Sequence, residues 1–70
     1  MGDSETVARE ALAREIVSIV AEARAGGRML RTGLQAARLF AAYPEANRSV
    51  GHIIDQLTAE AVAAGVAFEN

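Results

Sequence analysis

Few side chains in this sequence have the chemistry of a catalyst or a metal ligand. His52 is the single histidine, and Asp55 follows it one helical turn later. A metal site needs three or four ligands with supporting groups around them, and no further cluster follows this pair. The chain has no cysteine, which excludes thiolate ligands and disulfides. We therefore expect no metal site, and we interpret His52 as an exposed polar residue near the start of a helix.

Nucleophilic or acid–base catalysis is also poorly supported. It requires a nucleophile held against an activating base, or paired acids in a concave pocket. The serines Ser4, Ser18 and Ser49 are better explained as helix caps or surface residues. Gly26-Gly27 follows a predicted helix rather than a strand, which is the wrong context for a phosphate-binding loop. We therefore predict no catalytic activity, no cofactor and no small-molecule substrate.

The arginines are the remaining candidates for ligand chemistry, because the chain contains no lysine. Residues 26–48 carry a net charge of +3, between an N-terminal part at −2 and a C-terminal part at −3. Arg31 and Arg38 share one stripe of a predicted helix with Gln35, which is a candidate strip for an anion or a nucleic acid. We prefer internal pairing with acids on the flanking helices, given the acidic balance of the chain. The candidate partners are Glu15, Glu22 and Glu60.

A small helix-turn-helix regulator is the alternative function, because two helices joined by a turn end the chain. The exposed face of the last helix would then read the nucleic acid, but its residues are His52, Asp55, Gln56 and Glu60. Phosphates would repel this acidic face. The turn is also longer than the three or four residues usual for the motif. Nucleic-acid binding therefore ranks second, and it would use Arg28, Arg31, Arg38 and Arg48.

Hydrophobic spacing predicts a first helix over residues 4–25, with Ser4 as its N-cap. Leu12, Ile16, Ile19 and Ala23 alternate spacings of four and three residues, and Val20 broadens this seam. Gly26-Gly27 ends the helix. Val17 lies off the seam, either as a stray surface valine or as part of a second contact strip for another subunit.

The segment 31–43 is predicted as a short central helix with an unusually wide apolar surface. Thr32 and Gln35 fit a capping box, and Pro44 ends the helix. Its predicted buried face consists of Gly33, Leu34, Ala37, Phe40 and Ala41. A helix this apolar is normally buried by more than one neighbour. We therefore expect the rest of the chain to wrap over it.

A third helix is predicted over residues 50–64, with Ser49 as N-cap and Gly65 as the residue that ends it. Val66 can fold back on its last turn, and a short extended tail with Phe68 follows. The whole chain, residues 1–70, is thus predicted to be a single all-α domain, a compact antiparallel three-helix bundle. Its predicted core is Leu12, Ile16, Ile19, Leu34, Ala37, Phe40, Ala41, Ile53, Leu57 and Ala61.

Size and composition favour a protein-interaction module. A domain of 70 residues is marginally stable alone and often gains stability from a partner subunit. We predict self-association as a homodimer, or binding to another protein, in the cytoplasm of a bacterium with a GC-rich genome. No apolar run is long enough to span a membrane. The predicted partner-binding residues are Leu12, Ile16, Val17, Val20 and Phe68.

Overall fold

The computed structural model describes residues 3–69 and confirms the predicted all-α, three-helix architecture. Its helix bounds differ from the predicted ones by at most one residue at each end. The elements in chain order are α1 (Ser4–Gly26), strand β1 (Leu30–Arg31), α2 (Thr32–Ala42), the 3-10 turn η1 (Pro44–Ala46), α3 (Val50–Ala64) and strand β2 (Phe68–Glu69).

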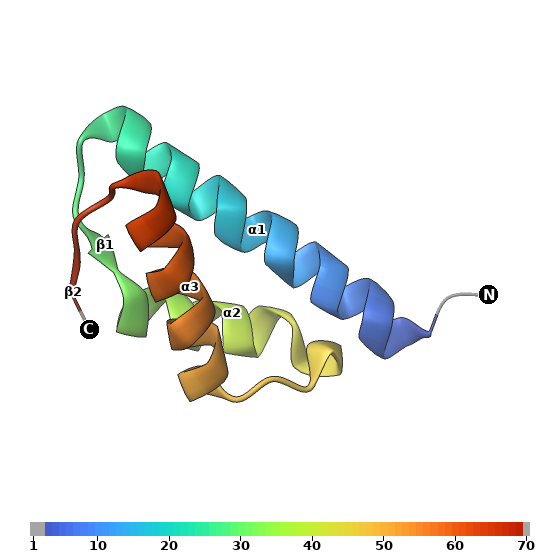
Figure 1. The fold of residues 1–70 in the computed structure, drawn as a ribbon. Helices are drawn as coiled ribbons and strands as arrows, with labels where there is room; N and C mark the ends of the chain where they lie inside the picture. The colour runs from blue at the N-terminus through green and yellow to red at the C-terminus, as the bar shows by residue number, and fades with distance from the viewer. Residues whose placement is uncertain (1–2, 70) are drawn as a thin grey trace.

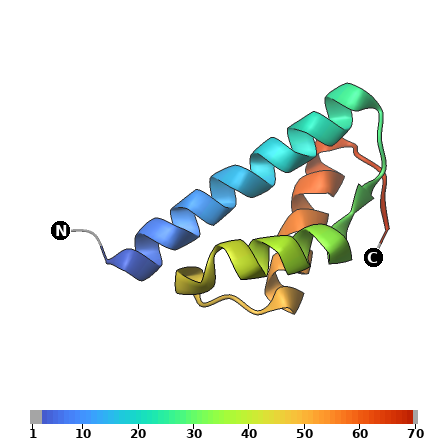
Figure 2. The ribbon, with the colours of Figure 1, turned by 180° about the vertical axis from the view of Figure 1, so that it is seen from behind.

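The central helix is α3 and not α2, because α1 and α2 both pack against α3. In Figures 1 and 2, α1 is the long helix, α2 runs back in roughly the opposite direction, and α3 crosses both. The packing agrees with these views, because α3 contacts both α1 and α2, whereas α1 approaches the end of α2 mainly through η1. The prediction that α2 is the central helix is therefore wrong. Along most of their length, α1 and α2 are separated.

The ends of α1 and α3 follow local sequence rules. Asp3, rather than the predicted Ser4, caps α1 by accepting a hydrogen bond from the amide of Glu5, while Ser49 caps α3 as predicted. Gly65 has a φ of 72°, in the left-handed region that glycine adopts without a steric penalty. The amide of Val66 then donates to the carbonyl of Ala61 at 2.8 Å. This arrangement buries Val66, as predicted.

The C-terminal tail forms a strand pair that the sequence did not predict. Strand β2 lies parallel to β1, with Phe68 beside Leu30 and Glu69 beside Arg31. The hydroxyl of Thr32 donates to the carbonyl of Glu69 at 3.1 Å and is buried. Thr32 is therefore tied to the tail rather than serving in the predicted capping box with Gln35. The pairing fixes the start of α2 against the end of the chain.

Replacing Thr32 with valine should lower the free energy of unfolding by about 1 kcal/mol, because the carbonyl of Glu69 loses a buried donor while the shape is retained. Urea denaturation measures this loss. Replacing the exposed Thr6 with valine is the matched control and should change stability little. Equal effects of the two substitutions would contradict the role assigned to the Thr32 hydroxyl.

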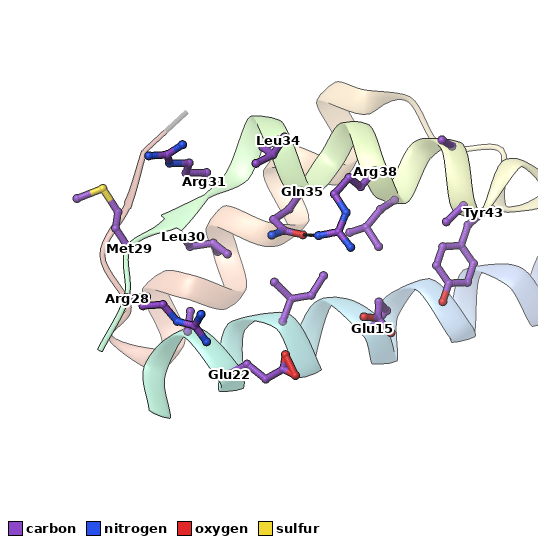
Figure 3. A pocket seen from close by; sticks show the side chains of 15 residues that line it. Glu15, Glu22, Arg28, Met29, Leu30, Arg31, Leu34, Gln35, Arg38 and Tyr43 are labelled. Atoms are coloured by element: carbon purple, nitrogen blue, oxygen red, sulfur yellow. Dashed lines mark hydrogen bonds between the residues drawn. The ribbon is translucent and has the colours of Figure 1, made fainter. Parts of the chain in front are cut away.

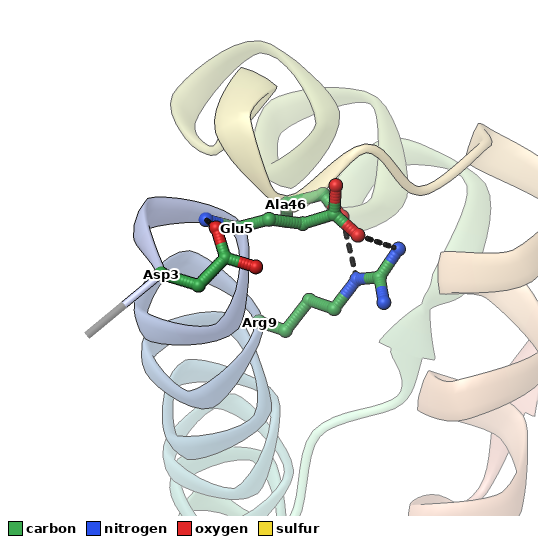
Figure 4. A network of polar contacts seen from close by, with 4 residues as sticks. All are labelled: Asp3, Glu5, Arg9 and Ala46. Atoms are coloured by element: carbon green, nitrogen blue, oxygen red, sulfur yellow. Dashed lines mark hydrogen bonds and ion pairs between the residues drawn. The ribbon is translucent and has the colours of Figure 1, made fainter. Parts of the chain in front are cut away.

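The turn η1 is held against the first turns of α1 by one arginine (Figure 4). The Arg9 guanidinium donates from Nε to the carbonyl of Ala46 at 2.8 Å, and its Nη2 lies 2.6 Å from the Glu5 carboxylate. Ala46 itself is fully buried. These contacts close one end of the space between α1 and α2, whereas the tail and β1 lie at the other end.

The core of α1 and α3 is close to the predicted one, but that of α2 is not. Leu12, Ile16, Ile53, Leu57 and Ala61 are buried as predicted, and Ile19 is half-buried against the core. Of the α2 residues assigned to the core, all four are exposed, and that part of the prediction is wrong. They are Leu34, Ala37, Phe40 and Ala41. The buried residues of α2 are instead Thr32, Ala36 and Leu39.

The rotation of α2 has a physical reason. The helix is apolar on two neighbouring faces, so hydrophobic spacing alone does not choose between them. Strand β1 leads directly into α2, and its pairing with β2 buries Leu30. Thr32 is held against the tail by the same pairing, so the residues one and two turns later, Ala36 and Leu39, point inward. The long-range strand contact, rather than the helix pattern, decides which face is buried.

Candidate functional site

The most conspicuous surface of the molecule is an uncovered apolar face of α2. We define the outer face of α2 as Gly33, Leu34, Ala37, Phe40 and Ala41, which is the face of this helix that the sequence predicts to be buried. Leu34 is 56% exposed and Phe40 is 49% exposed. Two large apolar side chains are therefore half in water on a face without a single charged residue.

The outer face of α2 has a defined relief. Gly33, Ala37 and Ala41 are spaced four residues apart and form a ridge of small side chains along the helix. At about 100° per residue, Leu34 projects on one side of this ridge and Phe40 on the other side. Small residues at the contact allow a second helix to approach toward the short end of the ~8–10 Å interaxial range. The outer face of α2 is therefore a ridge of small residues with one large apolar side chain on each side.

A groove separates α1 from α2 on the adjoining side of α2 (Figure 3). Its volume is about 800 Å³. Ile19, Leu30 and Leu39 contribute to its apolar lining, and Leu34 and Ala41 of the outer face of α2 line it as well. The groove is thus a consequence of the separation between α1 and α2. Its rim on α2 is shared with the outer face of α2.

The groove brings together the arginine strip predicted from the sequence, but it brings acids as well. Arg28, Arg31 and Arg38 line it from β1 and α2, and Glu15 and Glu22 line it from α1. In Figure 3 the two carboxylates lie across from Arg38. An anionic ligand would therefore meet both signs of charge in this groove.

The predicted pairing of these arginines with acids of the flanking helices is wrong. Among residues 3–69, the ion pairs are Arg9–Glu5 and an exposed contact of 3.6 Å between Arg31 Nε and Glu69 Oε1. Arg38 donates from Nη1 to Oε1 of Gln35 at 3.1 Å. The acids proposed as partners, namely Glu15, Glu22 and Glu60, are in neither pair.

The predicted partner-binding residues fall into two groups. Leu12, Ile16 and Val20 are buried within the single chain and have no surface to offer a partner, so their assignment is corrected to core. Val17 is 52% exposed, and Phe68 is half-buried against the core. A role in partner binding stays a prediction for these two residues.

The remaining chemical candidates stay isolated in space. Within residues 3–69, three or more His, Cys, Asp or Glu side chains nowhere come together in a way that would hold a metal ion. His52 is exposed in the first turn of α3. No helix in the described part of the chain is long and apolar enough to cross a bilayer.

No protein-family model, curated protein or solved structure matches this chain. The surface that the fold exposes therefore provides the evidence for function. Sequence reasoning found the five residues of the outer face of α2 but assigned them to the wrong environment. The hydrophobic pattern of α2 carries no signal that separates its two faces, because the pairing of β1 with β2 decides which face is buried.

Proposed function

We propose that this chain is a protein–protein interaction module without catalytic activity, and that it forms a homodimer through the outer face of α2. The observation that carries the proposal is the half exposure of Leu34 and Phe40 on a face that has no charge. Full burial of such a side chain contributes about 1.5–3 kcal/mol, and roughly half of this is forgone here because each side chain is about half exposed. A contiguous apolar surface of this kind usually marks a contact site on a small protein.

A second copy of the chain is the simplest occupant of this face. An uncharged face is best covered by another uncharged face, because any charge brought against it would be desolvated without a partner. The chain supplies such a face itself, and a homodimer closes the assembly with one contact. The helix is about 16 Å long at 1.5 Å per residue, so the buried area lies toward the low end of specific interfaces. We therefore expect exchange between monomer and dimer.

Nucleic-acid binding is less well supported by the geometry. The arginines that it would use line the groove opposite Glu15 and Glu22, and those carboxylates would repel a phosphate backbone. Arg48 is half-buried in the turn before α3, apart from the other arginines that line the groove. We therefore rank self-association above the regulator hypothesis.

Sedimentation equilibrium over a wide concentration range tests the proposal. The wild-type chain should change from the mass of one chain to that of two as the concentration rises through the micromolar range. Its thermal midpoint should rise with concentration, because the partner binds only the folded form. A single-chain mass at high micromolar concentration, with a melting transition that does not depend on concentration, would overturn the proposal.

Replacing Phe40 with glutamate should weaken the dimer by about tenfold or more, since even 1.4 kcal/mol changes an equilibrium constant tenfold. Helix content measured by circular dichroism should not change, because Phe40 is half exposed in the single chain. Val17→Glu tests the competing surface, because Val17 is an exposed residue of α1 that the sequence predicts to bind a partner, and it should leave the dimer intact if the outer face of α2 is the interface. The opposite result, with Val17→Glu disruptive and Phe40→Glu silent, would move the interface to α1.

A further inference from the structure

We propose that the homodimer is an antiparallel, two-fold pairing of α2 with the partner's α2, centred on Ala37. In this pairing Leu34 packs over the partner's Ala41, and Phe40 packs over the partner's Gly33. The inference rests on the proposed function, since it specifies how a second copy occupies the outer face of α2. It follows from where the large and small side chains lie around and along one helix.

The positions can be stated relative to Ala37. At about 100° and 1.5 Å per residue, Leu34 and Ala41 lie about 60° and 40° to one side of Ala37, at opposite ends of the face. Phe40 and Gly33 lie about 60° and 40° to the other side, again at opposite ends. Each side of the face therefore carries one large and one small residue, separated by about 10 Å along the helix axis.

In this pairing, a two-fold axis passes between the two Ala37 residues and is perpendicular to both helices. It reverses the direction of the partner helix, and it places the side of the face that carries Leu34 next to the same side of the partner's face. Ala37 then meets the partner's Ala37 at the axis. Leu34 comes within about 1.5 Å of the height of the partner's Ala41, and Phe40 similarly meets the partner's Gly33. Each large side chain thus faces a small one, and the small residues let the helices approach closely. The face is complementary to itself, which an isologous interface requires.

A parallel pairing of the two α2 helices also places large residues over small ones, but with different partners. Leu34 would then face the partner's Gly33, and Phe40 would face the partner's Ala41. Parallel helices bring the like ends of their dipoles together, whereas antiparallel helices place opposite ends side by side. This electrostatic difference favours the antiparallel pairing. The two pairings predict different close contacts, so they can be separated by experiment.

Disulfide trapping distinguishes the antiparallel pairing from the parallel one. The natural chain has no cysteine, so each disulfide that forms joins two introduced cysteines. A disulfide forms only where Cα atoms come within about 4.4–6.8 Å. Chains carrying Leu34→Cys are mixed with chains carrying Ala41→Cys, and in a second mixture Phe40→Cys is combined with Ala41→Cys. Ala37→Cys alone reports on the axis. Val62→Cys, on an exposed position of α3 outside the face, is the control. Oxidation is carried out in a glutathione buffer so that only persistent contacts are trapped.

For the antiparallel pairing we expect strong cross-linking of the mixture of Leu34→Cys and Ala41→Cys, and of Ala37→Cys alone. The mixture of Phe40→Cys and Ala41→Cys, and the control Val62→Cys, should cross-link weakly. Preferential cross-linking of the second mixture would overturn the antiparallel pairing in favour of the parallel one. A dimer in sedimentation without cross-linking of Ala37→Cys would overturn the pairing through this face while self-association remains. A monomer in sedimentation would instead refute the proposed function on which the inference rests.

Discussion

Replacing Leu57 with alanine should lower the free energy of unfolding by about 2–5 kcal/mol. Leu57 is completely buried in α3, the helix that contacts both α1 and α2. Truncation removes apolar contacts on both sides and leaves a cavity that two packed helices cannot easily close. A domain of 70 residues has a total stability of about 3.5–10 kcal/mol. We therefore expect the variant to be largely destabilised, as measured by urea denaturation with linear extrapolation.

Phe40→Ala is the matched comparison, because it also removes a large apolar side chain. At low micromolar concentration, where the monomer predominates, it should cost much less than Leu57→Ala, since about half of the Phe40 side chain is already exposed to solvent. The pattern of α2 in the sequence instead predicts a comparable loss for the two variants, because it places Phe40 in the core together with Leu57. Equal losses for the two variants would restore that prediction and contradict the observed rotation of α2.

The sequence specifies α1 and α3 well because each of these helices has one apolar stripe. Ile53, Leu57 and Ala61 recur at spacings of four residues, and His52 and Asp55 lie on the exposed part of α3. Only one rotation of such a helix buries the apolar side chains without also burying charge. The caps at Ser49 and Gly65 are local interactions within a few residues, so the sequence also identifies the ends of α3.

The sequence does not specify the rotation of α2 because both competing faces are apolar. One face contains Ala36 and Leu39, and the other contains Leu34 and Phe40. The choice depends on the pairing of β1 with β2, a contact between residues almost forty positions apart. Single-sequence patterns carry no signal for a strand pair of two residues. The candidate interaction surface was missed for the same reason, because it is the face that α2 leaves uncovered.

The neighbouring alanines Ala36 and Ala37 should respond to glutamate in opposite ways. Ala36 is completely buried on the inner side of α2, so Ala36→Glu places a carboxylate and several extra atoms in a filled core. Burial of an unpaired charge costs several kcal/mol, and overpacking adds about 1–3 kcal/mol. Together these costs approach the whole stability of a domain of this size. We expect Ala36→Glu to be unfolded by circular dichroism at 25 °C.

Ala37→Glu, in contrast, should fold with native helix content, because Ala37 is exposed on the outer face of α2. In the proposed dimer, however, it places two like charges beside the two-fold axis in the closest part of the contact. We therefore expect the variant to stay monomeric at concentrations where the wild type is dimeric, as measured by sedimentation equilibrium.

Lowering the pH should not rescue the folding of Ala36→Glu fully, because the extra volume of the side chain remains. In Ala37→Glu, protonation of the introduced carboxylate removes the repulsion between the two subunits, so lowering the pH should restore the dimer. If both variants unfold, α2 is buried on both faces and the outer face of α2 is not a free surface. If Ala37→Glu folds and still dimerises, the interface lies elsewhere on the molecule.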